Sequence, residues 1–175
     1  KFEALIEEAR ALARVEEIAA CSPRLEALIL GFGDLAASLG FRESRTGHEH
    51  AYPGDPWHAA RARMIAACRA NGIDAIDGPF ANLTDARAYR REAGWASTLG
   101  AVGKWCIHPK QIPIANDVFA PSMEEIGFAR TQVETYLNSS REGVGAASAD
   151  GILVDAASLR LYQAVLDRAK QTGRL

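Results

Sequence analysis

The sequence predicts an α/β fold with a parallel sheet, namely part of a (β/α)8 TIM barrel, followed by a helical C-terminal segment. Four short apolar runs alternate with segments of helical pattern within residues 1–138, an order typical of a parallel sheet. A half barrel and a flavodoxin-like open sheet both fit four such units. The residues that follow the apolar runs favour the barrel, because ligands bind a barrel where its strands end. These residues are Glu7, Asp34, Asp77 and His108.

The first strand–helix–strand unit lies at the start of the chain. Two apolar runs, residues 4–7 and 26–31, have the length of buried parallel strands, and the helical pattern over residues 9–20 connects them. A polar loop over residues 40–55 comes next. Residues 31–33 read Gly-Phe-Gly and lack the third glycine of a dinucleotide-binding motif, so no nucleotide fold is indicated.

Capping residues mark the next helix. Asp55 is a favourable N-cap, Pro56 suits a first helical turn, and Gly72 is a typical stop after Asn71. The remaining barrel elements are a strand over 73–77, a helix over 84–93 that ends at Gly94, and a strand over 101–107.

The C-terminal part begins with a longer helix. Ser122 and Glu125 have the spacing of a capping box, and the four apolar residues that follow at helical spacing predict packing against a core. They are Ile126, Ala129, Val133 and Leu137. Residues 139–149 contain two Gly and three Ser, which predicts a linker. Residues 150–175 then form an amphipathic helical segment that is too short to fold alone.

Composition limits the partners. The chain has 175 residues, 48% hydrophobic and 24% charged, with a formal net charge of −2, so neither nucleic acid nor an anionic membrane is expected as a partner. No apolar stretch approaches the ~20 residues of a membrane helix, and no signal peptide is visible, so a cytoplasmic location is expected. A complete barrel needs about 250 residues, so we expect a piece of a longer polypeptide.

The three cysteines indicate neither disulfides nor zinc. Cys21, Cys68 and Cys106 are isolated and odd in number, and buried free thiols are the default interpretation. Because Cys106 lies near Lys104, the Cys106 thiol is also a candidate nucleophile, which is the less favoured alternative. His48 and His50 flank Glu49 in the polar loop, but we expect no zinc there.

Glu7 and Asp34 are the strongest candidate site residues. They follow adjacent strands and lie 27 residues apart in sequence, since 34 − 7 = 27. Two carboxylates at the same edge of a parallel sheet are oxygen ligands suited to Mg²⁺. The alternative is that Glu7 caps the next helix and Asp34 begins another.

Five segments together resemble the citrate lyase beta-subunit-like branch of the HpcH/HpaI aldolase family, which also contains malyl-CoA lyases. The segments are residues 5–12, 22–36, 75–78, 103–112 and 150–155. The resemblance places residue 1 in about the fifth barrel strand, so residues 1–138 would be the C-terminal half of a TIM barrel. Residues 150–175 would then be a lid that docks on a neighbouring subunit of a homotrimer or homohexamer.

The resemblance also implies roles for single residues. Glu7 and Asp34 match the protein ligands of Mg²⁺, and Asp155 matches a lid carboxylate that moves a proton, with Asp150 as second choice. Three further residues are candidates for binding substrate or CoA, each with a structural alternative. Asp77 could cap the turn at Gly78, Lys104 could pair with a carboxylate at a strand end, and His108 could shape the loop before Pro109.

The activity implied is a Mg²⁺-dependent carbon–carbon lyase. Its substrate would be a 3-hydroxyacyl-CoA such as malyl-CoA or citryl-CoA, and its products acetyl-CoA or propionyl-CoA and an oxoacid such as glyoxylate. Two alternatives stay open: a malyl-CoA thioesterase with the same metal site, and a non-catalytic subunit of a citrate lyase-like complex. The sequence does not choose the acyl group or the physiological direction.

Overall fold

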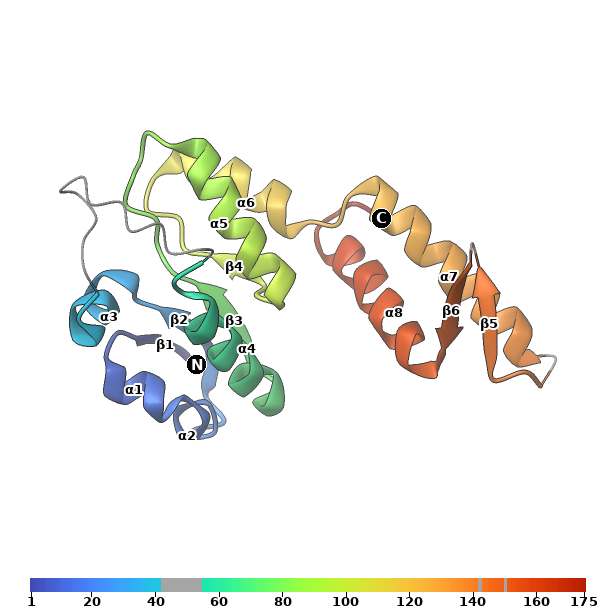
Figure 1. Cartoon of the computed structure of the whole chain (residues 1–175), viewed down its shortest axis with the longest axis horizontal. Helices are drawn as coiled ribbons and strands as arrows, with labels where there is room; N and C mark the ends of the chain where they lie inside the picture. The colour runs from blue at the N-terminus through green and yellow to red at the C-terminus, as the bar shows by residue number, and fades with distance from the viewer. Residues whose placement is uncertain (42–54, 142, 150) are drawn as a thin grey trace. The chain divides into compact units, whose positions relative to one another are not determined.

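The computed structural model describes residues 1–41, 55–141, 143–149 and 151–175. They form two compact units, Lys1–Phe119 and Ala120–Leu175 (Figure 1). The cluster of His48, Glu49 and His50 and the candidate acid Asp150 lie outside the described residues.

The sheet of the first unit has the winding of a barrel. Its strands are β1 (Phe2–Ile6), β2 (Leu25–Leu30), β3 (Asp74–Asp77) and β4 (Gly103–Lys104), all parallel, in the spatial order β1-β2-β3-β4. A doubly wound sheet reverses its strand order at a switch point, whereas a barrel adds each new strand beside the last. The observed order therefore confirms a partial barrel-type fold.

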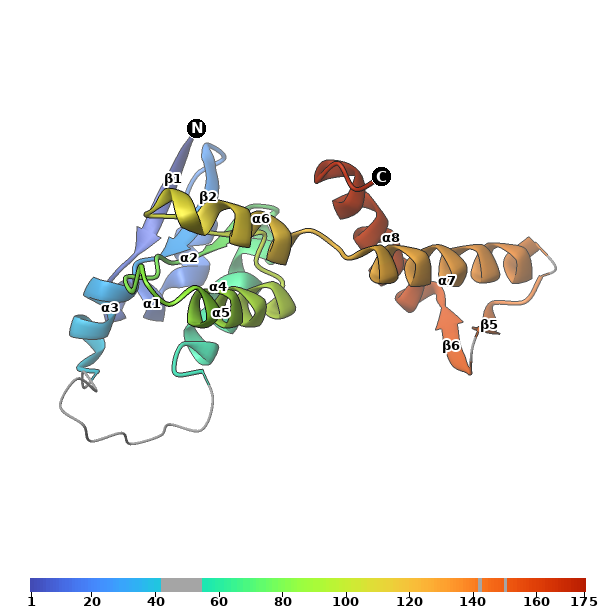
Figure 2. The ribbon, with the colours of Figure 1, turned by 90° about the horizontal axis from the view of Figure 1, so that it is seen from above.

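Helices follow each strand, as the alternating pattern predicted (Figures 1 and 2). The expected helix over 9–20 is two short helices, because Arg14 leaves helical geometry between them. The predicted stop at Gly94 was wrong, since the buried face continues through Ala93 and Ala96 to a cap at Gly100 with φ of 104°. The elements are α1 (Ala9–Ala13), α2 (Val15–Ala19), α3 (Phe32–Leu39), α4 (His58–Asn71), α5 (Ala86–Leu99), η1 (Pro109–Gln111) and α6 (Ile112–Phe119).

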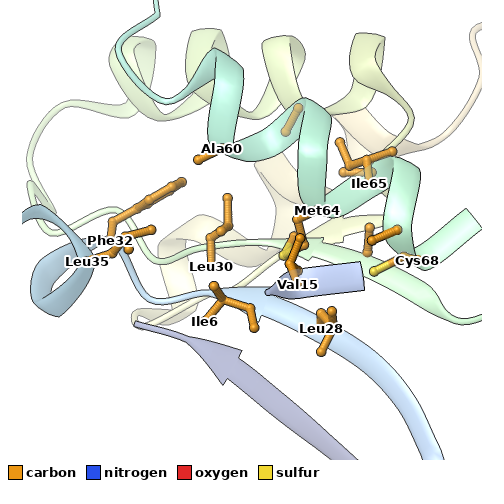
Figure 3. Packing of buried hydrophobic residues seen from close by; sticks show 14 of the residues in the cluster. Ile6, Val15, Leu28, Leu30, Phe32, Leu35, Ala60, Met64, Ile65 and Cys68 are labelled. Carbon is orange, nitrogen blue, oxygen red and sulfur yellow. The ribbon is translucent and has the colours of Figure 1, made fainter. Parts of the chain in front are cut away.

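The two faces of this sheet have different surroundings. Ile6, Leu28 and Leu30 point toward α4 and pack in one core with Met64 and Cys68 (Figure 3). Successive strand residues alternate between faces, so the residues between these point to the opposite side, which is the interior side of a barrel. The residues on this interior side include Leu5, Ile29 and Ile76, which are register partners on three neighbouring strands.

The second unit is a helical hairpin with a small antiparallel sheet. It contains α7 (Met123–Arg141), β5 (Ala146–Ala149), β6 (Ile152–Asp155) and α8 (Ala156–Gln171). The capping box is confirmed: the Ser122 amide donates to Glu125 Oε2 at 2.7 Å, and the Glu125 amide to Ser122 Oγ at 3.1 Å.

Two expectations for this unit differ from the structure. The segment 139–149, predicted as a linker, contains the end of α7 and strand β5, because its small residues pair with the apolar run of β6. Leu137 is 45% exposed although the other residues of its predicted face are buried. No helix in the described part of the chain is long and apolar enough to cross a membrane.

Candidate metal and active site

Glu7 and Asp34 lie at the carboxyl edge of the sheet, as predicted. Glu7 directly follows β1, and Asp34 stands in the first turn of α3, just after β2. Both line one open pocket, and they share it with Leu5, Glu8, Ala11 and Ser38. Two acidic side chains from neighbouring strand ends therefore face the same space. The alternative for Asp34, a residue near a helix start, is also correct, and the two roles are compatible.

A glycine makes room for the Glu7 side chain. A Cβ placed on Gly31 would lie 2.6 Å from Glu7 Oε1 and 2.8 Å from Cδ, closer than real carbon atoms approach. The Gly31 amide donates to the Ile6 carbonyl at 3.0 Å, so the two strand ends cannot separate to relieve such a clash without losing this bond. The Glu7 carboxylate thus occupies the space that a side chain at position 31 would need.

A second contact ties the two ligand-bearing segments together. The Ala9 amide, at the start of α1, donates to Ser38 Oγ in α3 at 2.9 Å. This bond joins the helix after Glu7 to the helix that carries Asp34. One hydrogen bond between backbone groups, Gly31 to Ile6, and one from a backbone amide to a side chain, Ala9 to Ser38, therefore hold these segments together.

The pair fits Mg²⁺ by the chemistry of its donors. Mg²⁺ is commonly held by one or two carboxylates, with water and substrate oxygens completing an octahedron. Within the described ranges, no three His, Cys, Asp or Glu residues gather in a group that could hold a metal. The open pocket leaves room for water and substrate beside Glu7 and Asp34.

Asp77 and Lys104 do not line this pocket. They are register partners on β3 and β4, and Asp77 shares the helix-facing side with Ala75. Lys104 Nζ lies 2.7 Å from Asp77 Oδ2, 2.6 Å from Glu92 Oε1 and 2.8 Å from the Gly78 carbonyl oxygen. Their expected roles in binding substrate or CoA gain no support from this position, since both point away from the barrel interior. The structure favours the ion-pair alternative for Lys104.

Arg61 completes a buried ion network with these residues. Its guanidinium donates to Asp77 Oδ1 at 2.7 Å, pairs with Asp55, and lies 3.2 Å from Glu92 Oε1. Burial acts to lower the pKa of Arg61, but hydrogen bonds and the charges of Asp77, Asp55 and Glu92 outweigh it and raise the pKa. Arg61 therefore has a structural role in ion pairing.

The network as a whole was not predicted, although the sequence carries a signal for it. Arg61 is spaced with Met64, Ile65 and Cys68 on the buried stripe of α4. A charged residue inside such a stripe requires a buried partner of opposite charge. Asp77, at the end of the next strand, is that partner.

His108 and Asp155 act as helix caps. His108 Nδ1 accepts from the Lys110 amide at 3.2 Å at the start of η1, in agreement with the loop-shaping alternative. Asp155 Oδ1 accepts from the amides of Ala157 and Ser158 at 2.9 and 2.8 Å, which completes a capping box. Hydrogen bonds from the Ser158 backbone and side chain are the main cause that lowers the pKa of Asp155.

The cysteines are free thiols. Burial raises the pKa of Cys68 to about 11, which makes it a poor nucleophile. Cys106 Sγ lies 3.3 Å from the Tyr89 hydroxyl, and burial together with this thiol raises the pKa of Tyr89.

Known proteins confirm the family. Residues 2–109 match the family model described as HpcH/HpaI aldolase/citrate lyase, and the chain belongs to this family. It is 42% identical over 179 residues to the L-malyl-CoA/beta-methylmalyl-CoA lyase of Cereibacter sphaeroides strain ATCC 17025, a match that covers 97% of this chain and 56% of the relative. It is 31% identical to the citrate lyase subunit beta of Haemophilus influenzae, over 97% of this chain and 56% of that protein.

Solved structures agree with the fold. A citrate lyase from Burkholderia xenovorans LB400 superposes with a TM-score of 0.81 and 31% identity, over 99% of this chain and 54% of that one. The protein CitE from Mycobacterium tuberculosis, in complex with magnesium, acetoacetate and coenzyme A, gives a TM-score of 0.77 and 33% identity, over 95% and 60%. The chain spans about half the length of the curated relatives it matches.

Proposed function

We propose that the protein carrying this chain is a Mg²⁺-dependent carbon–carbon lyase that cleaves a 3-hydroxyacyl-CoA into an acyl-CoA and an oxoacid. The observation that carries the proposal is the pair Glu7 and Asp34 in one pocket at the carboxyl edge of a barrel-type sheet. Membership of a family whose relatives include malyl-CoA lyases supports a malyl-CoA-like substrate. The products would then be acetyl-CoA or propionyl-CoA and glyoxylate.

Glu7 and Asp34 would hold the metal through their carboxylate oxygens. When bound, Mg²⁺ supplies Lewis-acid polarisation of the carbonyl oxygen that forms as the carbon–carbon bond breaks. A magnesium complex of a related structure supports this choice of ion. Gly31 keeps the space for the Glu7 carboxylate, and the bond between Ala9 and Ser38 keeps α3 beside α1.

The cleavage shifts two bonding electron pairs, those of the O–H and carbon–carbon bonds, and moves two protons. The substrate hydroxyl loses its proton and becomes the carbonyl of the oxoacid, while the electron pair of the broken carbon–carbon bond passes to a thioester enolate. The enolate carbon then gains a proton and gives the acyl-CoA. In the condensing direction a base removes this proton again.

Asp155 is the proposed carrier of the proton at the enolate carbon. Its lowered pKa keeps it a carboxylate at neutral pH, the form that accepts a proton in the condensing direction. The cap uses Oδ1, which accepts from Ala157 and Ser158, so proton transfer at Oδ2 is compatible with the cap. Asp150 is the second candidate.

Assembly through the second unit is part of the proposal. We expect residues 150–175 to dock on a neighbouring subunit of a homotrimer or homohexamer, where Asp155 would meet that subunit's metal site. Three apolar side chains of β6 and α8 that are 43–66% exposed support such docking. They are Ile152, Leu153 and Leu161.

Three other functions are alternatives to this proposal. A malyl-CoA thioesterase would keep Glu7 and Asp34 but direct water at the thioester carbonyl. The relative named citrate lyase subunit beta favours citryl-CoA cleavage within a larger complex, or a non-catalytic subunit of one.

Product analysis separates these functions. The intact protein is incubated with Mg²⁺ and either malyl-CoA or citryl-CoA in separate samples. Thioesters and acids are separated by chromatography, with EDTA-treated samples as controls. We expect acetyl-CoA and glyoxylate, formed only with the metal. Free CoA and malate would establish the thioesterase, and no turnover of malyl-CoA or citryl-CoA would favour the non-catalytic subunit.

A further inference from the structure

Phe32 lies close to two buried cations of the ion network. The Arg61 guanidinium carbon is 4.9 Å from the centre of the Phe32 ring, and Lys104 Nζ is 5.2 Å from it. Distances below about 6 Å give an attraction between a cation and the negative face of an aromatic ring. The ring is 8% exposed, so water screens this attraction little.

The cations themselves are immobilised. Asp77 binds both of them, and Glu92 also contacts both, while Asp55 holds Arg61 alone. A third neighbour is Trp57, whose ring centre lies 4.6 Å from that of Phe32. The Phe32 ring therefore sits in a cage of side chains formed by Trp57, Arg61 and Lys104.

Glycine also contributes to this cage. A Cβ on Gly78 would clash first with the Leu30 carbonyl oxygen and would also lie 2.8 Å from Phe32 Cδ2, so the turn after β3 passes close to both the end of β2 and the ring. The cage thus includes the turn that follows Asp77.

The ring connects this cage to the candidate metal site. Between Leu30 and Asp34 the sequence reads Gly-Phe-Gly, so Phe32 is the one side chain in the turn that leads from β2 to Asp34. Phe32 is the first residue of α3, and Asp34 stands two residues later in the same turn of helix. A displacement of the ring would move the start of α3, and with it the Asp34 carboxylate relative to Glu7.

We propose that Phe32, held by Arg61 and Lys104, is a positioning residue that sets the Asp34 carboxylate for Mg²⁺ binding. The ring and both cations lie on the helix side of the sheet and act on the metal only through Asp34. The inference rests on the proposed assignment of Glu7 and Asp34 as metal ligands. It explains why two buried cations lie beside an aromatic ring at this point of the fold.

The test measures Mg²⁺ binding by calorimetry on the intact protein without substrate, together with thermal unfolding. Phe32→Leu removes the ring face and keeps an apolar side chain, and Phe32→Met replaces it if that variant fails to fold. Phe80→Leu is the matched control, because Phe80 packs edge-on against Tyr89 in the same core, and the described residues show no contact of its ring with Arg61 or Lys104. Asp34→Asn tests the metal site itself.

We expect the Phe32 variants to raise the Mg²⁺ dissociation constant about 10- to 100-fold, the range found when a residue that orients a ligand is changed. Phe80→Leu should leave it within about twofold of wild type. Equal changes in the Phe32 and Phe80 variants, or none in the Phe32 variants, would overturn the positioning role. Wild-type Mg²⁺ affinity in Asp34→Asn would instead overturn the metal assignment.

Discussion

At the scale of residues, the candidate metal site depends on the close approach of the Glu7 side chain to Gly31. Glu7 and Asp34 come from segments 27 residues apart, and their carboxylates line one pocket because position 31 carries no side chain. The spacing of the two acids is visible in the sequence. The need for glycine between them is not, since it depends on where the Glu7 side chain lies.

Gly31→Ala should therefore weaken Mg²⁺ binding. The added methyl group would overlap the Glu7 carboxylate and displace it, so we expect a rise of about 10- to 100-fold in the Mg²⁺ dissociation constant. Gly33→Ala is the control, because no atom lies within 4 Å of its added Cβ. Calorimetric titration with Mg²⁺ measures the dissociation constants of both variants. Equal affinities would show that the space at position 31 is not needed for Mg²⁺ binding.

At the scale of elements, one buried arginine adds ion pairs to the apolar packing of α4 on the sheet. Arg61 connects α4 to β3 through Asp77 and to α5 through Glu92. Arg63 lies two residues further along the same helix and pairs with Glu16 at the surface. Arg61 is buried and contacts three carboxylates, whereas Arg63 is exposed and pairs with one, so comparing them measures what the buried network contributes.

Arg61→Ala should lower the free energy of unfolding by about 3–5 kcal/mol, because it leaves Asp77 buried beside fewer positive charges. Arg63→Ala should change it little, because its pair with Glu16 is exposed to water. Urea denaturation of both variants measures the difference. A small, equal loss in both would show that the network does not hold α4 in place.

Local signals predicted some element boundaries and missed others. The N-cap predicted at Asp55 was wrong, because α4 begins at His58 and the Asp55 carboxylate pairs with Arg61. The Gly72 stop and the capping box of Ser122 with Glu125 are confirmed because these signals act within one helical turn. The stop at Gly94 was wrong because packing of Ala96 against the core outweighs the cost of one glycine in a helix.

At the scale of the whole molecule, the two units carry different parts of the proposed chemistry. Both candidate metal ligands lie in the first unit, and the candidate proton carrier Asp155 lies in the second. The main hydrophobic cluster consists of residues of the first unit alone. We therefore expect the first unit to keep the arrangement of Glu7 and Asp34 without the second.

Ending the protein after Phe119 should retain Mg²⁺ binding and abolish turnover. Glu7 and Asp34 keep their surroundings, whereas Asp155 is removed. Calorimetry and the chromatographic assay measure the two properties on the same sample. Full activity of the shortened protein would refute the lid role, and loss of Mg²⁺ binding would show that the first unit depends on the second.

The sequence by itself determined the parallel α/β class, the family and the two candidate metal ligands. Alternating apolar runs and carboxylates at strand ends are local patterns, and a sequence shows them directly. The tertiary structure alone decided the barrel order of the strands and the burial of Arg61, Asp77 and Lys104 in one network. Strand pairing joins residues as distant in sequence as Ala27 and Asp74, and the ion pairs join Asp77 to Arg61 and Lys104, 16 and 27 positions away. Only the folded chain brings such residues together.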